Sequence, residues 1–450
     1  MKCVVIGGGV AGLAAAHFLV GDHGIAGQDL TILESSDRVG GCLRPVILEG
    51  QTLDAGPDAL LTRRPEGTDL LRSVGLDAQR VTPATGRAYL ACGDRLHAYP
   101  SGLFLGIPMR PESVLGTDLL SEPGRARALR GFALPPTADT SDVTVAEAVG
   151  RRWGPEVADR LAGPLIAAVH AGRADYLSAA ACASQLFPDA SPQPSTGGLD
   201  AAPPFISLEG GLWQLADRLH AVLQQTNVTA QTGRPVHAVT QTRQGWAVRA
   251  GSDELLADRV VMAVGPSSAA KLLAPTSPAA AKSLASIELA SVAIATVLLS
   301  PAAQFPEGSG FLVPQGVSNS RLTTACTWFD QKWPRMARDD GRVVRLSTGR
   351  HGDSRFAELD DAALVAELIG ELGDLTDQTV EARSAVVSRF TDAFPQYGVG
   401  HIGLVADAQR ELERVTSGTL AVCGNAYFGV GLPAVIASAR SAAEMICRAV

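Results

Sequence analysis

Short apolar runs separated by glycine open the chain. Residues 2–6 (KCVVI) are rich in β-branched side chains, residues 10–20 are rich in alanine and leucine, and residues 30–33 form a second apolar run that ends at Glu34. Short runs bounded by glycine predict buried strands, and the longer alanine-rich stretch predicts a helix. The order strand, glycine turn, helix, strand is typical of a parallel βαβ unit.

Further along, the apolar positions alternate between the period of a helix and that of a strand. We expect a hairpin over residues 88–99 and helices over 66–75, 210–223, 360–372 and 433–448. Strands are expected at residues 205–208, 228–231, 236–242, 246–250, 256–264, 292–299, 310–313, 323–328, 343–348, 379–390 and 419–423. The uncharged run at 289–304 is shorter than the roughly 20 apolar residues that span a bilayer, so it predicts a buried strand.

Helical periodicity dominates between residues 111 and 186. The expected helices are residues 113–120, 123–130, 145–153, 155–168 and 178–187. Asp142 and Thr144 precede the third of these in the manner of N-capping residues. Residues 188–204 are rich in proline, serine and glycine, which is typical of a surface linker.

These patterns predict an α/β protein of more than one domain, because 450 residues exceed what a single core usually spans. We expect a discontinuous Rossmann-like dinucleotide-binding domain made of residues 1–75, 205–285 and 415–450. A mixed α+β substrate domain would comprise residues 76–110 and 286–414. Residues 111–204 would be a helical insertion with its linker.

Composition narrows the classes of partner. The net charge is −8 and no basic block occurs, which argues against a nucleic-acid partner. The seven cysteines are scattered, with no pair at metal or redox spacing, so we expect reduced thiols and no metal site. A strand begins at residue 2 without a basic and apolar leader before it. We therefore expect a cytoplasmic protein without a transmembrane segment and with at most peripheral membrane contact.

Gly7, Gly9 and Gly12 stand at the spacing of a dinucleotide-binding turn. That spacing allows a tight turn, lets a pyrophosphate approach the main chain, and lets the helix pack closely on the strand. The phosphates would lie at the helix N-terminus, where unpaired amide donors and the helix dipole favour negative charge. Glu34 follows Gly12 by 22 residues, an offset at which a carboxylate accepts hydrogen bonds from a ribose.

Two segments after Glu34 indicate which dinucleotide is bound. Residues 35–41 (SSDRVGG) resemble the second phosphate loop of the FAD-dependent amine oxidase and porphyrinogen oxidase superfamily, and residues 54–58 (DAGPD) resemble its flavin-side loop. NAD dehydrogenases do not usually carry this continuation. We therefore expect FAD as the cofactor, which makes the Rossmann-like domain an FAD-binding domain.

Motifs along nearly the whole chain resemble one family within that superfamily, the porphyrinogen oxidases. They occur at residues 151–154 (RRWG), 171–178 (AGRADYLS), 207–215 (SLEGGLWQL), 310–314 (GFLVP), 332–334 (KWP), 394–401 (FPQYGVGH) and 424–433 (GNAYFGVGLP). Members of this family are flavoproteins that oxidise protoporphyrinogen or, in one bacterial branch, coproporphyrinogen III. The order and spacing of the motifs carry the resemblance.

The resemblance implies cofactor-binding residues from both ends of the chain. They are Gly7, Gly8, Gly9, Val10, Ala11, Gly12, Glu34, Ser35, Arg38, Gly40, Gly41, Cys42, Gly56, Pro57, Asp58, Ala59, Val236, Phe390, Gly424, Asn425, Val430, Gly431 and Leu432. It also implies that Ala168, His170, Ser309, Gly310 and Leu312 lie near the flavin face and the substrate. No catalytic side chain is named, because a flavin can accept hydride from a porphyrinogen carbon without one.

The implied reaction is the FAD-dependent oxidation of coproporphyrinogen III to coproporphyrin III in haem biosynthesis. Six electrons leave the substrate, and dioxygen takes them up in three steps that release hydrogen peroxide. The four propionates of this substrate suit a wet, cationic pocket mouth, and the acidic composition favours it over the more apolar protoporphyrinogen IX. The expected partners are the porphyrinogen and dioxygen, with transient contact to the next haem-pathway enzyme.

Alternatives remain within and beyond this family: a protoporphyrinogen IX oxidase, and a flavin- or porphyrin-binding carrier without turnover. The carrier is suggested by departures from the family pattern. Ser101 and Phe104 stand where several relatives have a cation thought to meet a propionate, Ala168 replaces a glycine, and Phe390 replaces a tryptophan of some relatives.

Only a few cations are candidates for the substrate site. Arg110 and Arg173 are candidates for the pocket rim, although most arginines are solvated surface charges. Amine oxidases typically place a lysine beside the flavin, and the best candidate here, Lys332, lies in a different motif. An amine oxidase is therefore the less favoured enzyme class.

Overall fold

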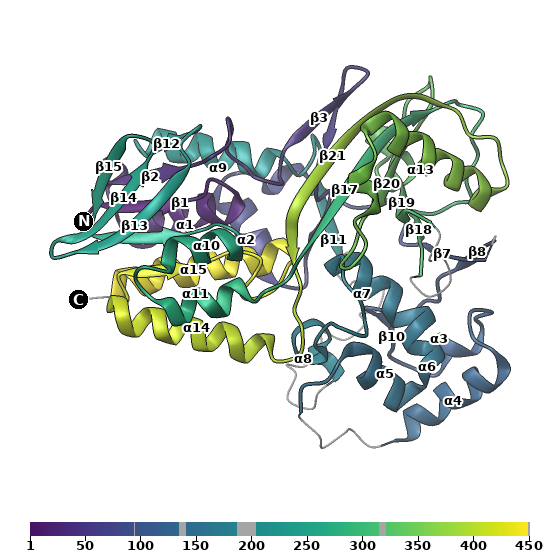
Figure 1. Ribbon diagram of the computed structural model, residues 1–450. Helices are drawn as coiled ribbons and strands as arrows, with labels where there is room; N and C mark the ends of the chain where they lie inside the picture. The colour runs from purple at the N-terminus through teal and green to yellow at the C-terminus, as the bar shows by residue number, and fades with distance from the viewer. Residues whose placement is uncertain (94, 135–140, 187–203, 315–320, 449–450) are drawn as a thin grey trace.

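The computed structural model describes residues 1–93, 95–134, 141–186, 204–314 and 321–448. A parallel sheet with its helices lies on the side of the molecule that carries both termini, a larger sheet lies on the other side, and a helical block lies below the larger sheet (Figure 1). The predicted linker and Asp94 in the turn of the predicted hairpin fall outside the described residues, apart from Pro204.

The parallel sheet contains strands from widely separated parts of the chain. In spatial order they are β12 (Thr229–Gln231), β2 (Leu30–Leu33), β1 (Cys3–Ile6), β16 (Arg259–Met262) and β22 (Leu420–Val422). All neighbouring pairs are parallel. The predicted α/β class and the discontinuous Rossmann-like sheet are therefore confirmed, whereas the residue boundaries of the three domains stay predictions.

Both faces of this sheet are buried, which explains why its strands are almost continuously apolar. Val5 points into one core and Val4 and Ile6 into the other. Four helices build the first core: α1 (Val10–Gly21), α2 (Pro65–Ser73), α9 (Gln214–Gln225) and α15 (Leu432–Arg448). The second core is built by α10 (Pro266–Leu273), α11 (Pro278–Ala285), α14 (His401–Thr416) and the antiparallel sheet of β13 (Val236–Thr242), β14 (Gly245–Ala250) and β15 (Asp253–Ala257).

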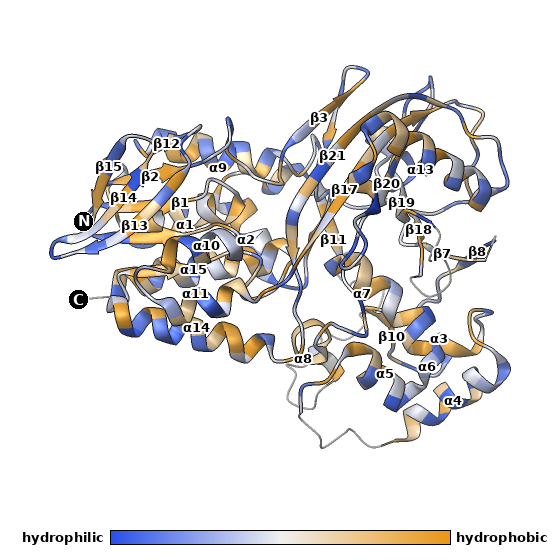
Figure 2. Ribbon diagram, in the orientation of Figure 1, coloured by the Kyte–Doolittle hydropathy of each residue, from blue (hydrophilic) through white to orange (hydrophobic). Residues whose placement is uncertain are grey.

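The larger sheet is mainly antiparallel. Its strands in spatial order are β21 (Ala382–Pro395), β17 (Leu289–Leu299), β20 (Arg342–Thr348), β19 (Thr323–Trp328), β18 (Gly310–Leu312), β7 (Tyr89–Cys92) and β8 (Arg95–Ala98). β17 is the buried strand predicted from the long uncharged run, and the hydropathy colours of Figure 2 mark it as largely hydrophobic. No helix among the described residues is long and apolar enough to cross a membrane.

The two faces of the larger sheet have different neighbours. Ala293, Ala295 and Val297 of β17 belong to one core with Leu364 and Leu368 of α13 (Asp361–Thr376), which covers the first face. On the other face, side chains of β17, β20 and β21 meet loops of the dinucleotide domain and the end of a helix from the helical block. The alternation of side chains along each strand produces this separation.

The helical block has mostly short helices. They are α3 (Glu112–Leu115), α4 (Glu122–Ala133), α5 (Val145–Trp153), α6 (Pro155–Val157), a π-helical turn (Ala158–Ala162), α7 (Gly163–His170) and α8 (Ala179–Cys182). The helix predicted at 145–153 is confirmed to the residue, because the Thr144 side chain caps it by accepting from the amide of Glu147. The helices predicted at 113–120 and 178–187 are shorter than expected.

One predicted strand is wrong in a way that matters for topology. Residues 256–264 were expected to form a single strand, but β15 ends at Ala257 and β16 begins at Arg259, in a different sheet. Asp258 lies between them, and its carboxylate accepts a hydrogen bond from the amide of Lys2 at 2.7 Å. The sequence pattern also missed α10, α11, α14 and the hairpin of β3 (Pro45–Leu48) and β4 (Gln51–Asp54).

Candidate functional site

The first glycine turn brings α1 against the end of β1 with no room for a methyl group. A Cβ on Gly12 would lie 1.9 Å from the carbonyl oxygen of Gly7, and a Cβ on Gly7 would lie 2.4 Å from that of Ala263. Gly9 differs, because a Cβ there would meet no atom closer than 4.0 Å. Gly9 is also the N-cap of α1 and makes no side-chain cap bond. The N-terminus of α1, which begins with Val10 and Ala11, is therefore approachable by a ligand.

Glu34 lies beside this turn at the end of β2. Its carboxylate accepts hydrogen bonds from the amide of Gly8 at 2.6 Å and from the amide of Ser36 at 2.8 Å. The segment before β13 runs alongside, since the amide of Arg234 donates to the carbonyl of Glu34 at 2.8 Å. Val236, at the start of β13, follows two residues later and is half-buried. The structure thus brings Glu34, Gly8 and Val236 into one region, as a binding site for the adenosine half would require.

The second phosphate loop packs directly on the first. The amide of Gly40 donates to the carbonyl of Gly8 at 2.8 Å, and Gly41 lies beside Gly9. Arg38 lies in the same loop, and its Nη2 donates to Asp217 at 3.3 Å. Its Nη1 is buried without a hydrogen-bond partner in the described chain. A buried guanidinium donor without a partner next to a helix N-terminus fits a pyrophosphate.

The flavin-side loop is held by cations from the larger sheet. Asp58 accepts from Lys332 Nζ and from Trp333 Nε1, both at 2.7 Å, and Arg345 Nη1 lies 3.7 Å away. Burial alone would raise the pKa of Asp58, but Lys332 and Arg345 together hold it well below its usual range. Arg345 also donates to the carbonyl of Gly56 at 2.5 Å. The side chain of Asp58, predicted to bind the cofactor, is thus committed to protein partners, and the KWP motif acquires a role that its sequence did not indicate.

The C-terminal loop between β22 and α15 is held by the motif at residues 394–401. The hydroxyl of Tyr397 donates to the carbonyl of Asn425 and accepts from the amide of Gly429 at 3.0 Å. His401 stacks on the Tyr397 ring with centroids 4.0 Å apart, and its Nε2 lies 3.0 Å from the carbonyl of Ala426. The predicted residues Gly424, Val430, Gly431 and Leu432 follow the same loop into α15.

His170 lies at the end of α7, with its ring turned into the helical block. It is 6% exposed, and its Nδ1 lies 3.9 Å from Cys182 Sγ. Burial lowers its pKa to about 4, so the imidazole is neutral near pH 7. The side chain of Gln396 donates to its carbonyl at 2.9 Å. Ala168, two residues earlier on α7, is exposed instead.

The other predicted substrate residues lie on β18, against which α7 packs. Gly310 has φ +132°, and a Cβ there would lie 2.0 Å from the carbonyl oxygen of Cys326. The hydroxyl of Ser309 donates to the carbonyl of Arg87 at 3.0 Å, so it is not free. Leu312 is half-buried and packs against the core of the helical block. The structure therefore brings α7 and β18 together, whereas their part in binding the substrate stays a prediction.

A row of half-buried side chains continues from Leu312 across the larger sheet. The strand register pairs Leu312 with Ala325, Ala325 with Ser347, and Ser347 with Ile294. These four are half-buried, whereas the residues that alternate with them in the core are fully buried. We call this row the sheet floor. It is mostly apolar, with the small residues Ala325 and Ser347 between Leu312 and Ile294, and apart from Leu312 the sequence analysis did not find it.

Phe390 joins the sheet floor to the flavin-side loop. It pairs with Val292 across β17 and β21, which puts it on the same face as Ile294. A Cβ on Gly56 would lie 3.5 Å from its ring. It also packs with Ala171, which follows His170. The predicted cofactor and substrate residues therefore meet around Phe390.

The cations considered for the pocket rim have different surroundings. Arg173 forms a bidentate pair with Asp175, at 2.9 and 2.6 Å, which neutralises its charge. Arg110 is exposed. The guanidinium of Arg63 lies over the ring of Phe104, 4.2 Å from its centroid. Arg63 follows the flavin-side loop in sequence. It therefore places a cation at the position where several relatives have one and this chain has Phe104.

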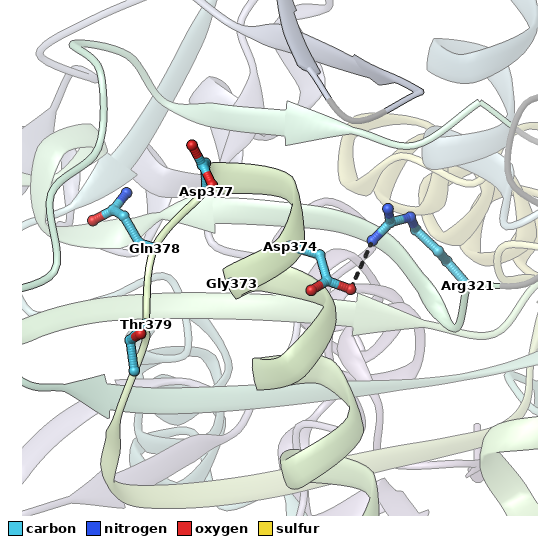
Figure 3. A pocket seen from close by; sticks show the side chains of 6 residues that line it. All are labelled: Arg321, Gly373, Asp374, Asp377, Gln378 and Thr379. Carbon is cyan, nitrogen blue, oxygen red and sulfur yellow. Dashed lines mark ion pairs between the residues drawn. The ribbon is translucent and has the colours of Figure 1, made fainter.

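A separate surface hollow of about 480 Å³ lies at the C-terminal end of α13. Figure 3 shows that Asp374 and Arg321 on its wall point toward each other, and the charged atoms are 3.9 Å apart. Since α13 covers the opposite face of the larger sheet, this hollow is remote from the sheet floor.

The fold and these loops define a dinucleotide-binding flavoprotein, and the glycine cradle and the unpaired donor of Arg38 fit FAD. The chain belongs to the flavin containing amine oxidoreductase family, whose sequence model matches residues 10–447. It is accordingly an FAD-dependent oxidoreductase.

Several known proteins are similar to it over almost their full length. The Coproporphyrinogen III oxidase of Mycobacterium leprae (strain TN) is 33% identical over 460 residues, which cover 98% of this chain and 97% of the relative. That of Bacillus subtilis (strain 168) is 29% identical over 98% of this chain and 96% of the relative. Among solved structures, a protein from Exiguobacterium sp. 255-15 has a TM-score of 0.86 at 28% identity, with 99% of this chain and 98% of that chain covered.

Replacement of Gly12 by alanine tests the first glycine turn. The new methyl group would overlap the carbonyl of Gly7, so α1 must move away from β1. We expect Gly12→Ala to weaken FAD binding by about tenfold or more, because the main chain no longer matches the pyrophosphate. The measurement is FAD affinity by flavin fluorescence. Gly21→Ala is the matched control, since a Cβ at that end of α1 meets nothing within 4 Å. Equal affinities for both variants would contradict the prediction.

Tyr397 and Tyr427 provide a matched pair for the C-terminal loop. Tyr397→Phe removes one donor and one acceptor that hold Asn425 and Gly429, so we expect a loss of about 1–3 kcal/mol of stability and weaker FAD retention. Tyr427→Phe removes a buried hydroxyl with no hydrogen-bond partner and should leave both unchanged or improved. Denaturant unfolding and FAD release on dilution measure the two effects. If Tyr397→Phe had the stability and the FAD retention of the wild type, the hydroxyl would not hold the loop.

The buried imidazole of His170 predicts a pH-dependent stability. Its folded pKa of about 4 lies below the ordinary value of 6.5, so the unfolded chain takes up the proton first as pH falls. Stability is therefore lost between pH 6.5 and 4 and is constant above pH 6.5. From pH 7 to pH 5 the wild type should lose about 2 kcal/mol more than His170→Gln. The exposed His237→Gln is the control and should behave like the wild type. If all three proteins lose the same unfolding free energy between pH 7 and pH 5, the buried neutral state of His170 is refuted.

Proposed function

We propose that the protein oxidises coproporphyrinogen III to coproporphyrin III, with FAD as hydride acceptor and dioxygen as terminal electron acceptor. The observation that carries the proposal is the full-length similarity to relatives named Coproporphyrinogen III oxidase, at 33% identity for the protein of Mycobacterium leprae and 29% for that of Bacillus subtilis. The sheet floor supports it, because a broad macrocycle needs a wide, flat and mostly apolar surface.

The overall reaction removes six hydrogens from the porphyrinogen, as six electrons and six protons. Three dioxygen molecules take them up as three molecules of hydrogen peroxide. Bound FAD supplies the hydride-accepting ring and passes the electrons on. The chain itself has to orient the macrocycle, exclude water and bind the propionates.

The residues around the floor suit these tasks. Leu312 and Ile294 offer apolar contact on either side of the small residues Ala325 and Ser347, so a ring can lie close to the sheet. Ala168 on α7 would close the slot from the side of the helical block. His170 is buried and neutral, so its part in the proposal is to support the end of α7, and no side chain is assigned as a general base.

Protoporphyrinogen IX is the second candidate substrate. The Protoporphyrinogen oxidase of Bos taurus is 28% identical over 484 residues, which cover 98% of each chain. Both porphyrinogens have the same ring system and lose the same six hydrogens, so the choice depends on the carboxylates that the pocket binds. Coproporphyrinogen III carries four propionates and protoporphyrinogen IX carries two. If cations line the floor, they therefore favour coproporphyrinogen III.

Turnover of the two porphyrinogens in air tests the proposal. We expect kcat/KM for coproporphyrinogen III to exceed that for protoporphyrinogen IX by about tenfold or more, with three molecules of peroxide released per porphyrin formed. Porphyrin fluorescence and a peroxide assay provide the measurement, and the protein stripped of FAD is the control. A preference for protoporphyrinogen would reverse the substrate assignment. Porphyrin binding without peroxide above the spontaneous rate would identify a carrier instead.

A further inference from the structure

Arg350 is a largely buried cation whose Nε has no hydrogen-bond partner among the described residues. Its residue exposure is 8%, and its Nε is sealed from solvent without a hydrogen bond. Within the described part of the chain no residue hydrogen-bonds or ion-pairs with this guanidinium. Burial lowers the pKa of Arg350, which expresses the cost of keeping the charge away from water. An arrangement of this kind is unfavourable in the free protein and becomes favourable when an anion binds.

The carboxylates around Arg350 are committed to other cations. Asp353, on the same loop, forms a bidentate pair with Arg355 at 2.9 and 2.8 Å. Glu288, at the adjacent start of β17, accepts from Tyr176 at 2.9 Å and pairs with His351 at 2.7 Å. In the nearest part of the helical block, the carboxylate of Asp175 is paired with Arg173. Burial lowers the pKa of Arg350 and nearby Asp353 partly opposes this shift, but no carboxylate among the described residues hydrogen-bonds or ion-pairs with the guanidinium.

The loop that carries Arg350 lies where the sheet floor meets α7. Ser347 of the floor lies three residues before Arg350 on β20. On the other side, the amide of His351 donates to the carbonyl of Ala171 at 2.7 Å, directly after His170. The main chain at Arg350 thus lies at the edge of the surface on which the porphyrinogen is proposed to lie.

A second buried arginine, which lies on β20 itself, shows what a structural role looks like. Arg345 is 5% exposed, pairs with Asp58, and donates to the carbonyls of Ala55 and Gly56. Its charge and its donors are used within the protein. Arg350 is nearly as buried and has no such contacts.

We propose that Arg350 binds a carboxylate of the substrate at the edge of the sheet floor. The proposal rests on the proposed function and names the residue that anchors one propionate. A guanidinium offers two parallel donors that match a carboxylate, and the low-polarity surroundings strengthen the pair. The anchor would add a second cation to Arg63, which covers Phe104 at the position where the sequence lacks one.

Substrates with and without free carboxylates test the anchor. We compare wild type, Arg350→Met and Arg350→Lys with coproporphyrinogen III and with its tetramethyl ester. Arg350→Met should raise KM for the acid by about tenfold or more with kcat changed less than about twofold, and Arg350→Lys should recover part of the loss. KM for the ester should be the same in all three proteins. Arg335→Met is the matched control: two of its guanidinium nitrogens are also buried without partners, but it stacks on Trp333, which packs with Leu298 and Val343, four residues along β17 and β20 from Ile294 and Ser347.

Each contrary outcome has a separate meaning. A wild-type KM for the acid in Arg350→Met overturns the anchor, as does a loss of bound FAD or a lower melting temperature in that variant, since either would assign Arg350 to the cofactor or to folding. If the wild type oxidises neither porphyrinogen, the proposed function fails. The anchor is then tested by absorbance titration with coproporphyrin III and its tetramethyl ester. The wild type must bind the acid more tightly than the ester, and Arg350→Met must bind both alike.

Discussion

The close approach of α1 to β1 is the constraint on which the rest of the site depends. The carbonyl of Gly7 occupies the space that any side chain at position 12 would need, so the helix starts immediately against the strand. That contact fixes the direction of the N-terminus of α1. It also fixes the amide of Gly8, which binds Glu34, and the carbonyl of Gly8, which binds Gly40. A single main-chain turn thus sets the positions of the two loops predicted to bind the phosphates and of Glu34, the carboxylate predicted to bind the ribose.

The remaining loops around the proposed flavin position are held from outside the dinucleotide domain. Asp58 is bound by Lys332 and Trp333, and the C-terminal loop is bound by the hydroxyl of Tyr397. Both sets of donors are attached to the larger sheet. The same sheet therefore supplies the floor and positions the loops. A movement of the sheet would shift the floor and the loops together. This shared support gives a physical reason for the unusual length of the two strands β17 and β21 that span the molecule (Figure 1).

The sequence predicted the elements whose signals are local. Thr144 and the apolar spacing after it located α5 to the residue, and the glycine spacing located the first turn. The sequence did not predict features that depend on contacts between distant parts of the chain. α14 begins after Gly400 in a left-handed conformation and has no side-chain cap, so nothing marked its start. Asp258 ends a strand because its carboxylate binds the amide of Lys2. The two residues are 256 positions apart, so the sequence pattern gives no sign of this contact. Ser347 and Ile294 become floor residues only through the register of four strands.

The two buried arginines of the β20 region illustrate why a binding site is harder to predict than a fold. Arg345 and Arg350 are alike in sequence, since both are arginines within or just after the same largely apolar strand. They differ in their contacts: Arg345 has two carbonyls and a carboxylate, whereas Arg350 has no hydrogen-bonded or ion-paired group among the described residues. A structural cation lowers the free energy of the folded chain, whereas an unpaired one raises it and is favourable only once a ligand supplies the opposite charge. The position of the unpaired charge is therefore information about the ligand, and it becomes visible only when every neighbouring carboxylate has been assigned to its own partner.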